Sequence, residues 1–445
     1  MIAKPFIQKN LRHVCLCSKT LASDALGNSM TIGDRLREEF SFVQGNYLIL
    51  VTSWILMDFA SEMPSLYYGP FVIYDLHASP SVLGFIGFAS VLALAAVQFP
   101  GGYLADRYGR RWLISTLTFG VAFSFLFFLF APSWEWILIG AIVGNLCLLY
   151  QPALMAMISD ATPPEKRGMA FSLTTLIGNV ATTPAPIIAG IIVTIYTRAF
   201  GMRIIYGIVV LGYLAAAILR SRLKETIQTE EKIRPRDLLA SYPQAIRESF
   251  AVWKTVPRSV LFLTTSNLII SFAISIGQLF FAVYAVEGDR SVLNITQIDW
   301  ALVSTALFAA MIIAAIPIGK LVDKIGRKTP LLLSHVAFVP GLLLFVYGNL
   351  ATLFIAMPLI GIGQLLFFSS FASLQTDLVP RENRAKIIGF SQFIGYVLMA
   401  FGLLTGGIIY SITPQLPFLL MLVALPPSFL IVLLLVHEPQ KREAG

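Results

Sequence analysis

Long apolar segments recur along almost the whole of this 445-residue chain and limit what it can fold into. Apolar residues make up 57% of the sequence and charged residues only 13%, whereas about a quarter of residues are charged in ordinary soluble proteins. A helix needs about 20 apolar residues to cross a membrane, and these segments do not alternate as barrel strands do. The sequence therefore predicts an all-α protein that crosses the lipid bilayer many times.

The apolar segments predict twelve membrane-spanning helices in two bundles. The expected spans are 46–70, 80–104, 112–131, 134–159, 169–196, 201–221, 259–286, 298–321, 330–348, 351–378, 387–412 and 416–436. They divide the chain into an N-terminal tail with a surface helix (1–45), a six-helix bundle (46–221), a linker (222–258), a second six-helix bundle (259–436) and a C-terminal tail (437–445). Apolar residues at helical spacing predict surface helices around Leu36 and around Ile246. Met30 is a second candidate for the start of translation.

The two bundles are expected to be repeats of one unit. The stretch GGYLADRYGRRW at 101–112 recurs as GKLVDKIGRK at 319–328, with an offset of 217 residues from Asp106 to Asp323. The same offset places Asp160 on Asp377. Because no gap is needed between these positions, the sequence indicates a duplicated six-helix unit.

The distribution of positive charge predicts the orientation in the membrane. Nearly all Lys and Arg fall in the tails and in the loops on one side, whereas the other side carries Arg198, Arg203 and Arg290. Loops rich in Lys and Arg stay in the cytoplasm. We therefore expect both termini to be cytoplasmic, and we attribute the net charge of +8 to orientation and not to binding of nucleic acid.

The duplicated motif resembles the signature loop of the major facilitator superfamily, and the resemblance covers residues 46–436. It implies the fold of that superfamily, with two pseudo-symmetric six-helix bundles, and alternating access to a central cavity. It also implies ion pairs from Arg110 to Asp160 and from Arg327 to Asp377 that help to close the cytoplasmic side. The residues assigned to this cytoplasmic gate are Gly102, Asp106, Arg107, Gly109, Arg110, Arg111, Asp160, Arg167, Asp323, Gly326, Arg327, Asp377 and Arg384.

Two carboxylates in the first span are the candidates for proton coupling. Asp58 and Glu62 lie on one helix face with Trp54, and an ionisable group inside a membrane is costly enough to indicate a function. Each carboxylate hinders the ionisation of the other, which favours a site that takes up a proton. The alternative is a pair of hydrated carboxyls at a wide opening, and Glu62 is the residue nearer the outside.

Neutral polar side chains in other spans are the candidates for the substrate cavity. With Trp54 they are Asn145, Gln151, Asn267, Ser271, Ser275, Gln278 and Gln364. Each could instead link two helices, and His335 is expected to pack between helices. We expect no Lys or Arg inside the membrane, so that a cationic or neutral amphiphile is favoured as substrate.

These features predict a secondary transporter and not an enzyme. Proton-coupled export of a drug or metabolite is the first hypothesis, and import of a neutral solute such as a sugar is the alternative. A membrane receptor or sensor is a third possibility, although no signalling domain is recognisable. No P-loop, no HExxH and no GxSxG sequence is present, which argues against an enzyme. We expect no cofactor, and we expect a monomer in the plasma membrane.

Overall fold

A computed structural model describes residues 40–163, 166–226, 253, 256–379 and 384–438. The chain forms two compact units, Met1–Gln44 and Gly45–Gly445, and only residues 40–44 of the first unit are described. The predicted surface helices around Leu36 and Ile246 lie outside the described residues. All the helices discussed below belong to the second unit.

The described residues of the first half of this unit form eleven helical segments. They are α3 (Gly45–Ser65), α4 (Tyr68–Pro70), the π-helix η1 (Phe71–Asp75), α5 (Pro80–Tyr108), α6 (Arg110–Leu129), α7 (Trp134–Cys147), the 3-10 helix η2 (Leu148–Tyr150), α8 (Gln151–Asp160), α9 (Arg167–Thr182), α10 (Ala185–Tyr196) and α11 (Arg198–Arg220). We call this set the first half.

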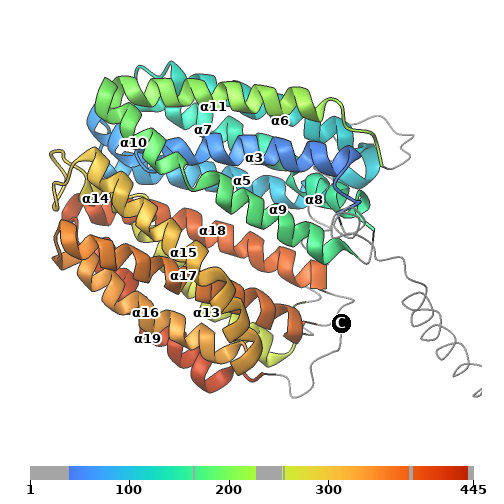
Figure 1. Ribbon diagram of the computed structural model, residues 1–445. Coiled ribbons are helices and arrows are strands. Elements are labelled where there is room, and N and C mark those ends of the chain that lie inside the picture. The colour runs from blue at the N-terminus through green and yellow to red at the C-terminus, as the bar shows by residue number, and fades with distance from the viewer. Residues whose placement is uncertain (1–39, 164–165, 227–252, 254–255, 380–383, 439–445) are drawn as a thin grey trace, which may run out of the picture. The chain divides into compact units, whose positions relative to one another are not determined.

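The described residues of the second half form seven helices. They are α13 (Arg258–Gln278), α14 (Phe281–Ala285), α15 (Gln297–Ile325), α16 (Lys328–Tyr347), α17 (Leu350–Leu378), α18 (Arg384–Ile412) and α19 (Leu416–Leu435). Figure 1 shows the labelled helices of the two halves as two neighbouring groups, with their long helices running in broadly the same direction. The described residues contain no β-strand, only an isolated bridge between Val286 and Ile295.

The described residues include ten helices that are long and apolar enough to cross a membrane. The other two predicted spans fall on α3 and on α9 with α10. α3 is less apolar because it carries Asp58 and Glu62, and α9 and α10 are separated near Pro184.

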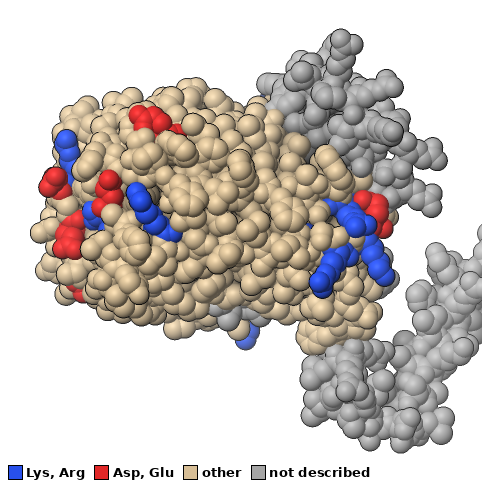
Figure 2. All heavy atoms as spheres, turned by 90° about the horizontal axis from the view of Figure 1, so that it is seen from above, with Lys and Arg blue, Asp and Glu red and all other residues tan. Residues whose placement is uncertain are grey.

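Figure 2 shows charged side chains at the two ends of the visible face, with a broad belt between them that carries very few. Such a belt suits the apolar interior of a bilayer.

Several of the predicted spans are interrupted, and prolines account for part of this. The predicted span 134–159 is divided into α7, η2 and α8, with Pro152 in the first turn of α8. Proline has no backbone N–H to continue a helix and clashes with the preceding turn. The predicted span 46–70 likewise ends early, at Ser65, one residue after Pro64. The break between α7 and α8 directs Tyr150 and Gln151 toward the cavity described below.

The signature loops turn at glycines with positive φ. Gly109 (φ 95°) separates α5 from α6, and Gly326 (φ 89°) separates α15 from α16. This backbone conformation is strained for residues with a side chain, so the two copies of the motif need glycine at equivalent places. We call the end of the helices with Arg110 and Arg327 the basic end, and the end with Asp75 and Arg198 the opposite end.

The two halves pack together through α5 on α18 and through α10 on α15. A close backbone approach is at Gly84 and Gly407, where a Cβ added to Gly84 would lie 2.6 Å from the Leu403 carbonyl oxygen and 2.8 Å from the Gly407 Cα. Small residues permit such contacts between membrane helices. Because Gly84 lies one turn after the start of α5 and Gly407 near the end of α18, this contact belongs to the opposite end.

Candidate functional site

A cavity of about 710 Å³, which we call the Asp58 cavity, lies between the two halves. It is lined from the first half by α3, α5, η2, α8 and α11, and from the second half by α18. This volume lies in the range of cavities that bind small organic molecules. The lining residues are Trp54, Met57, Asp58, Gln98, Leu148, Tyr150, Gln151, Pro152, Leu154, Met155, Tyr213, Arg220, Gln392 and Tyr396.

Asp58 lies at this cavity and not toward the lipid. The side chain of Trp54, one helical turn earlier on α3, lies near the Asp58 carboxylate. Its indole N–H is a donor only and can therefore donate to this carboxylate. A Cβ added at Gly178 would lie 3.8 Å from the Asp58 Oδ2 atom, which places α9 close beside the carboxylate. Of the predicted cavity residues, Trp54 and Gln151 line the same space.

Arg220 corrects the expectation that no Lys or Arg lies inside the membrane. It is the last residue of α11, its side chain is only 1% exposed, and it lines the Asp58 cavity. The sequence interpretation treated it as loop charge because it stands at the end of the predicted span 201–221. Side chains of a helix point back toward its N-terminus, and the long side chain of Arg220 therefore returns into the bundle.

Three elements of the first half hold the guanidinium of Arg220. Its Nε donates to the Ser53 Oγ atom at 2.9 Å, its Nη1 donates to the Thr118 Oγ1 atom at 2.9 Å, and its Cζ atom lies 5.1 Å from the centre of the Tyr150 ring. Both hydroxyls donate their own protons to carbonyl oxygens of Leu50 and Ile114. Each hydroxyl is therefore already oriented to accept from Arg220.

Glu62 is separated from the Asp58 cavity. It is not among the residues that line this cavity, and it accepts a hydrogen bond from the Ser65 hydroxyl at 3.0 Å. Ser65 is the last residue of α3 and is exposed. The two carboxylates thus occupy different surroundings although only one helical turn separates them.

Three predicted cavity residues line two smaller spaces. Gln364 and Gln278 line a mainly apolar cavity of about 370 Å³, which also holds Trp300. Asn145 and Gln278 line a space of about 300 Å³ that α5, α6 and α7 enclose together with residues of α13 and α18. Asn145 also donates to the Ala141 carbonyl oxygen of its own helix at 2.8 Å. These amides are therefore not brought together with Asp58.

The remaining candidates on α13 do not line any of these three cavities. Asn267 and Ser271 are half-buried, and Ser275 is fully buried. The Ser275 hydroxyl donates to the Phe272 carbonyl oxygen at 2.7 Å and lies against Gly402 so closely that no side chain fits there. Ser275 thus lies where α13 contacts α18.

The basic end contains both ion pairs that the family resemblance implies. Arg110 pairs with Asp160 within the first half, and the Arg327 Nε atom lies 3.2 Å from the Asp377 Oδ2 atom within the second half. Each pair joins the start of the helix after a signature loop to the end of another helix. The two pairs are repeats of one arrangement.

Two glutamates that the sequence interpretation missed cap the same helix starts. The carboxylate of Glu225 accepts from the backbone N–H groups of Arg110 and Arg111, at 3.2 and 3.0 Å. Glu438 does the same for Arg327 and, at 2.9 Å, for Lys328. A carboxylate is favourable at a helix N-terminus, where backbone N–H groups are unpaired.

Several predicted gate residues fall outside this description. The side chains of Asp106, Arg107, Arg167, Asp323 and Arg384, and the surroundings of Gly102, lie outside the described part of the structure. Arg111 is exposed, and its Nη2 donates to the Ser221 carbonyl oxygen at 3.0 Å. This bond ties α6 to the end of α11.

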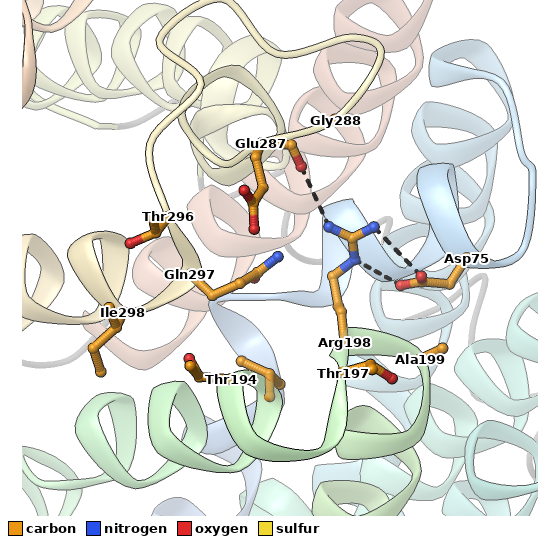
Figure 3. A pocket seen from close by; sticks show the side chains of 11 residues that line it. Asp75, Thr194, Thr197, Arg198, Ala199, Glu287, Gly288, Thr296, Gln297 and Ile298 are labelled. Carbon is orange, nitrogen blue, oxygen red and sulfur yellow. Dashed lines mark hydrogen bonds and ion pairs between the residues drawn. The ribbon is translucent and has the colours of Figure 1, made fainter.

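At the opposite end, polar side chains of the first half donate to backbone carbonyls of the second. Arg198 pairs with Asp75 at 2.7 Å and reaches the Glu287 carbonyl oxygen at 3.4 Å, as Figure 3 shows. The hydroxyl of Tyr67 donates to the Gln297 carbonyl oxygen at 2.9 Å, and that of Tyr74 to the Val283 carbonyl oxygen at 3.0 Å. These bonds hold the two halves together at this end.

His335 links three helices of the second half. It is buried, its Nδ1 lies 2.8 Å from the Leu331 carbonyl oxygen, and its Nε2 lies 2.8 Å from the Ser428 hydroxyl. Since a carbonyl only accepts, Nδ1 carries the proton and Ser428 donates to Nε2. Ser428 is also bonded to Ser266 at 2.7 Å. Both ring nitrogens of this histidine are thus satisfied.

The comparisons with known proteins cover both halves of the chain. A family model described as Major Facilitator Superfamily matches residues 50–290 and 290–445. The chain is 28% identical over 148 residues to a Na(+), Li(+), K(+)/H(+) antiporter of Planococcus maritimus, covering 32% of this chain and 34% of that protein. It is 33% identical over 141 residues to the class H tetracycline resistance protein of Pasteurella multocida, covering 31% and 35%. The chain thus matches about a third of the length of these two relatives.

A solved structure resembles the fold over most of the chain. A mutant of the nucleoside transporter NupG superposes with a TM-score of 0.67 and 14% sequence identity, covering 87% of this chain and 98% of that one. At this identity, the likeness concerns the arrangement of the helices.

Proposed function

This chain belongs to the Major Facilitator Superfamily and is an integral, multi-pass membrane transporter, and we propose that it exports a small organic molecule in exchange for protons. The family confirms the expectation of a transporter and not an enzyme. Export and proton exchange are our inference, and the names of the antiporter and the tetracycline resistance protein are consistent with them.

The position of Asp58 is the observation that carries this proposal. Its carboxylate lies at a cavity between the two halves, where α18 of the second half also contributes Gln392 and Tyr396. A group at such a place changes its surroundings when the halves move, and an ionisable group within a membrane helix is costly unless it serves a function. Asp58 would bind a proton in one state of the cycle and the substrate in the other. Glu62 stays the second candidate for the proton.

The polar residues around the Asp58 cavity would contact the substrate. Trp54 and Gln151 are in this group, and Gln98 donates to Gln151 at 3.3 Å. The amides at the two smaller spaces, Asn145, Gln278 and Gln364, would be reached in another conformation of the cycle. Asn267, Ser271 and Ser275 are assigned to helix packing.

The ion pairs at the basic end would regulate closure of that end. In this proposal the basic end is cytoplasmic, because Lys and Arg gather there, and both termini are on that side of the plasma membrane. The Arg110–Asp160 and Arg327–Asp377 pairs would keep each half rigid at its signature loop. The neighbouring residues Asp106, Arg107, Arg167, Asp323 and Arg384 are proposed to complete this gate, in a protein that works as a monomer.

The proposal is tested by transport in proteoliposomes. A compound that raises the melting temperature of the purified protein would be selected first, because ligands stabilise the folded state. An exchanger accumulates this compound when the lumen is made acidic, whereas a proton symporter accumulates it when the outside is acidic. The direction of the gradient that drives uptake therefore decides between export by exchange and import.

Asp58→Asn is expected to abolish accumulation driven by the pH gradient, because it removes the carboxylate that would take up a proton in exchange for the substrate. Asp58→Glu is the matched control, since it keeps a carboxylate and should keep gradient-driven uptake. Unchanged accumulation by the Asp58→Asn protein would remove Asp58 from the coupling.

A further inference from the structure

Arg220 and Asp58 are the charged side chains among the described residues that line the Asp58 cavity. The phenols of Tyr150, Tyr213 and Tyr396 also line it and contribute hydroxyls without a formal charge. The cavity thus presents one cation and one anion to whatever occupies it.

The guanidinium of Arg220 is only partly satisfied by the protein. Two of the five N–H groups that an arginine carries donate to Ser53 and Thr118. Its Nη2 makes no hydrogen bond to a described residue, and no described carboxylate forms an ion pair with it. Both hydroxyl partners are neutral. Asp58 lines the same cavity and interacts electrostatically with Arg220, but the two side chains form no ion pair. A buried cation with no anion in direct contact is unfavourable, so this site favours an anion from outside the protein.

The protein fixes the guanidinium before any ligand arrives. Ser53 on α3, Thr118 on α6 and the Tyr150 ring of η2 contact it from three elements. A helix-linking role alone would be fulfilled by a neutral side chain, which would not place a charge at the cavity. An arginine held in one orientation is suited to a carboxylate or phosphate, because its donors form a planar fork.

We propose that the Asp58 cavity binds a zwitterionic organic molecule, with its anionic group on Arg220 and its cationic group on Asp58. This rests on the proposed function, because a proton on Asp58 would displace the cationic group and release the molecule. The amides of Gln98, Gln151 and Gln392 supply neutral hydrogen bonds around the two charges. The cavity then complements a molecule without net charge that carries both signs, whereas the sequence favoured a cationic or neutral amphiphile.

The charges can be measured without knowing the substrate. Met155 lines the cavity and is 43% exposed, so Met155→Cys in a protein without native cysteines provides one reactive thiol. Its rates of reaction with the anionic sulfonatoethyl and the cationic trimethylammonioethyl methanethiosulfonates report the local potential. We use the ratio of the anionic to the cationic rate.

Arg220→Gln should lower this ratio roughly tenfold, from Coulomb's law for a unit charge about 10 Å away at an effective dielectric constant of about 40. Asp58→Asn should raise it by a similar factor, and the double variant should return to the starting ratio. Arg222→Gln is the matched control, since Arg222 is exposed and does not line the cavity; its ratio should change less than twofold.

An unchanged ratio in either single variant would overturn the proposal, because that charge would then not act on the cavity. Should Arg220→Gln fail to fold, Arg220→Lys and Asp58→Asn still decide: the lysine variant should keep the ratio near its starting value, and the asparagine variant should raise it. The experiment needs no transport. A failure of gradient-driven uptake with intact charge effects would therefore count against proton exchange and not against this site.

Discussion

The glycine contact between α5 and α18 predicts that one added methyl group will open the opposite end. Gly84→Ala places a Cβ 2.6 Å from the Leu403 carbonyl oxygen, and Gly407→Ala places one 2.6 Å from the Pro80 carbonyl oxygen. Ordinary contacts of a Cβ begin near 3.4 Å. The obstructing atoms belong to the backbone and cannot rotate away, so the two helices must separate by roughly 1 Å.

The expected free-energy change is large enough to redistribute the conformations. Inserting one methyl group into a well-packed contact costs about 1–3 kcal/mol, whereas the states of such a protein differ by only a few kcal/mol. The strain exists only while the opposite end is closed. The ratio of closed to open molecules should therefore fall by about 5- to 150-fold.

Distances between spin labels at the opposite end would measure this shift. Phe130 in the first half and Tyr347 in the second are 65% and 70% exposed, so Phe130→Cys and Tyr347→Cys accept labels in a protein without native cysteines. Gly84→Ala should add or enlarge a population at longer distance. Gly389→Ala is the control, since nothing lies within 4 Å of its added Cβ. The same distance distribution in Gly84→Ala and in the unsubstituted protein would refute the reasoning.

Two further predictions concern stability. Glu225→Gln and Glu438→Gln should each lower the free energy of unfolding by about 0.5–2 kcal/mol, because each removes a charged cap from two backbone N–H groups. Unfolding in denaturant would measure this, and a variant with the same unfolding midpoint as the unsubstituted protein would contradict it. His335→Leu should cost about 1–3 kcal/mol, because the buried Ser428 hydroxyl loses its acceptor. Uptake driven by the pH gradient should persist in this variant, and its loss would instead assign His335 to proton transfer.

The duplicated motif allowed the ion pairs of the basic end to be predicted from the sequence. The offset of 217 residues connects Arg110 with Arg327 and Asp160 with Asp377, and the structure contains both ion pairs. The all-helical fold followed from the apolar segments, and Asp58 stood out because carboxylates are rare in such segments. Its coupling role stays a prediction.

Other features depended on where side chains turn in space. Arg220 ends a span, and only the folded chain shows its guanidinium between Ser53 and Thr118. Glu225 and Glu438 were missed because their separation differs from the 217-residue offset, so the repeat does not align them. Ser275 was predicted to line the cavity because its side chain is polar, but its hydroxyl lies at the contact with Gly402.

The bonds from Tyr67, Tyr74 and Arg198 at the opposite end all have main-chain acceptors, at Gln297, Val283 and Glu287. A carbonyl oxygen is present whatever side chain its residue carries. Mutation can therefore change the side chains of Glu287 and Gln297 without removing these acceptors, but an apolar residue cannot replace any of the three donors. Sequence drift at this boundary should consequently be unequal, with freedom on the side that accepts and constraint on the side that donates.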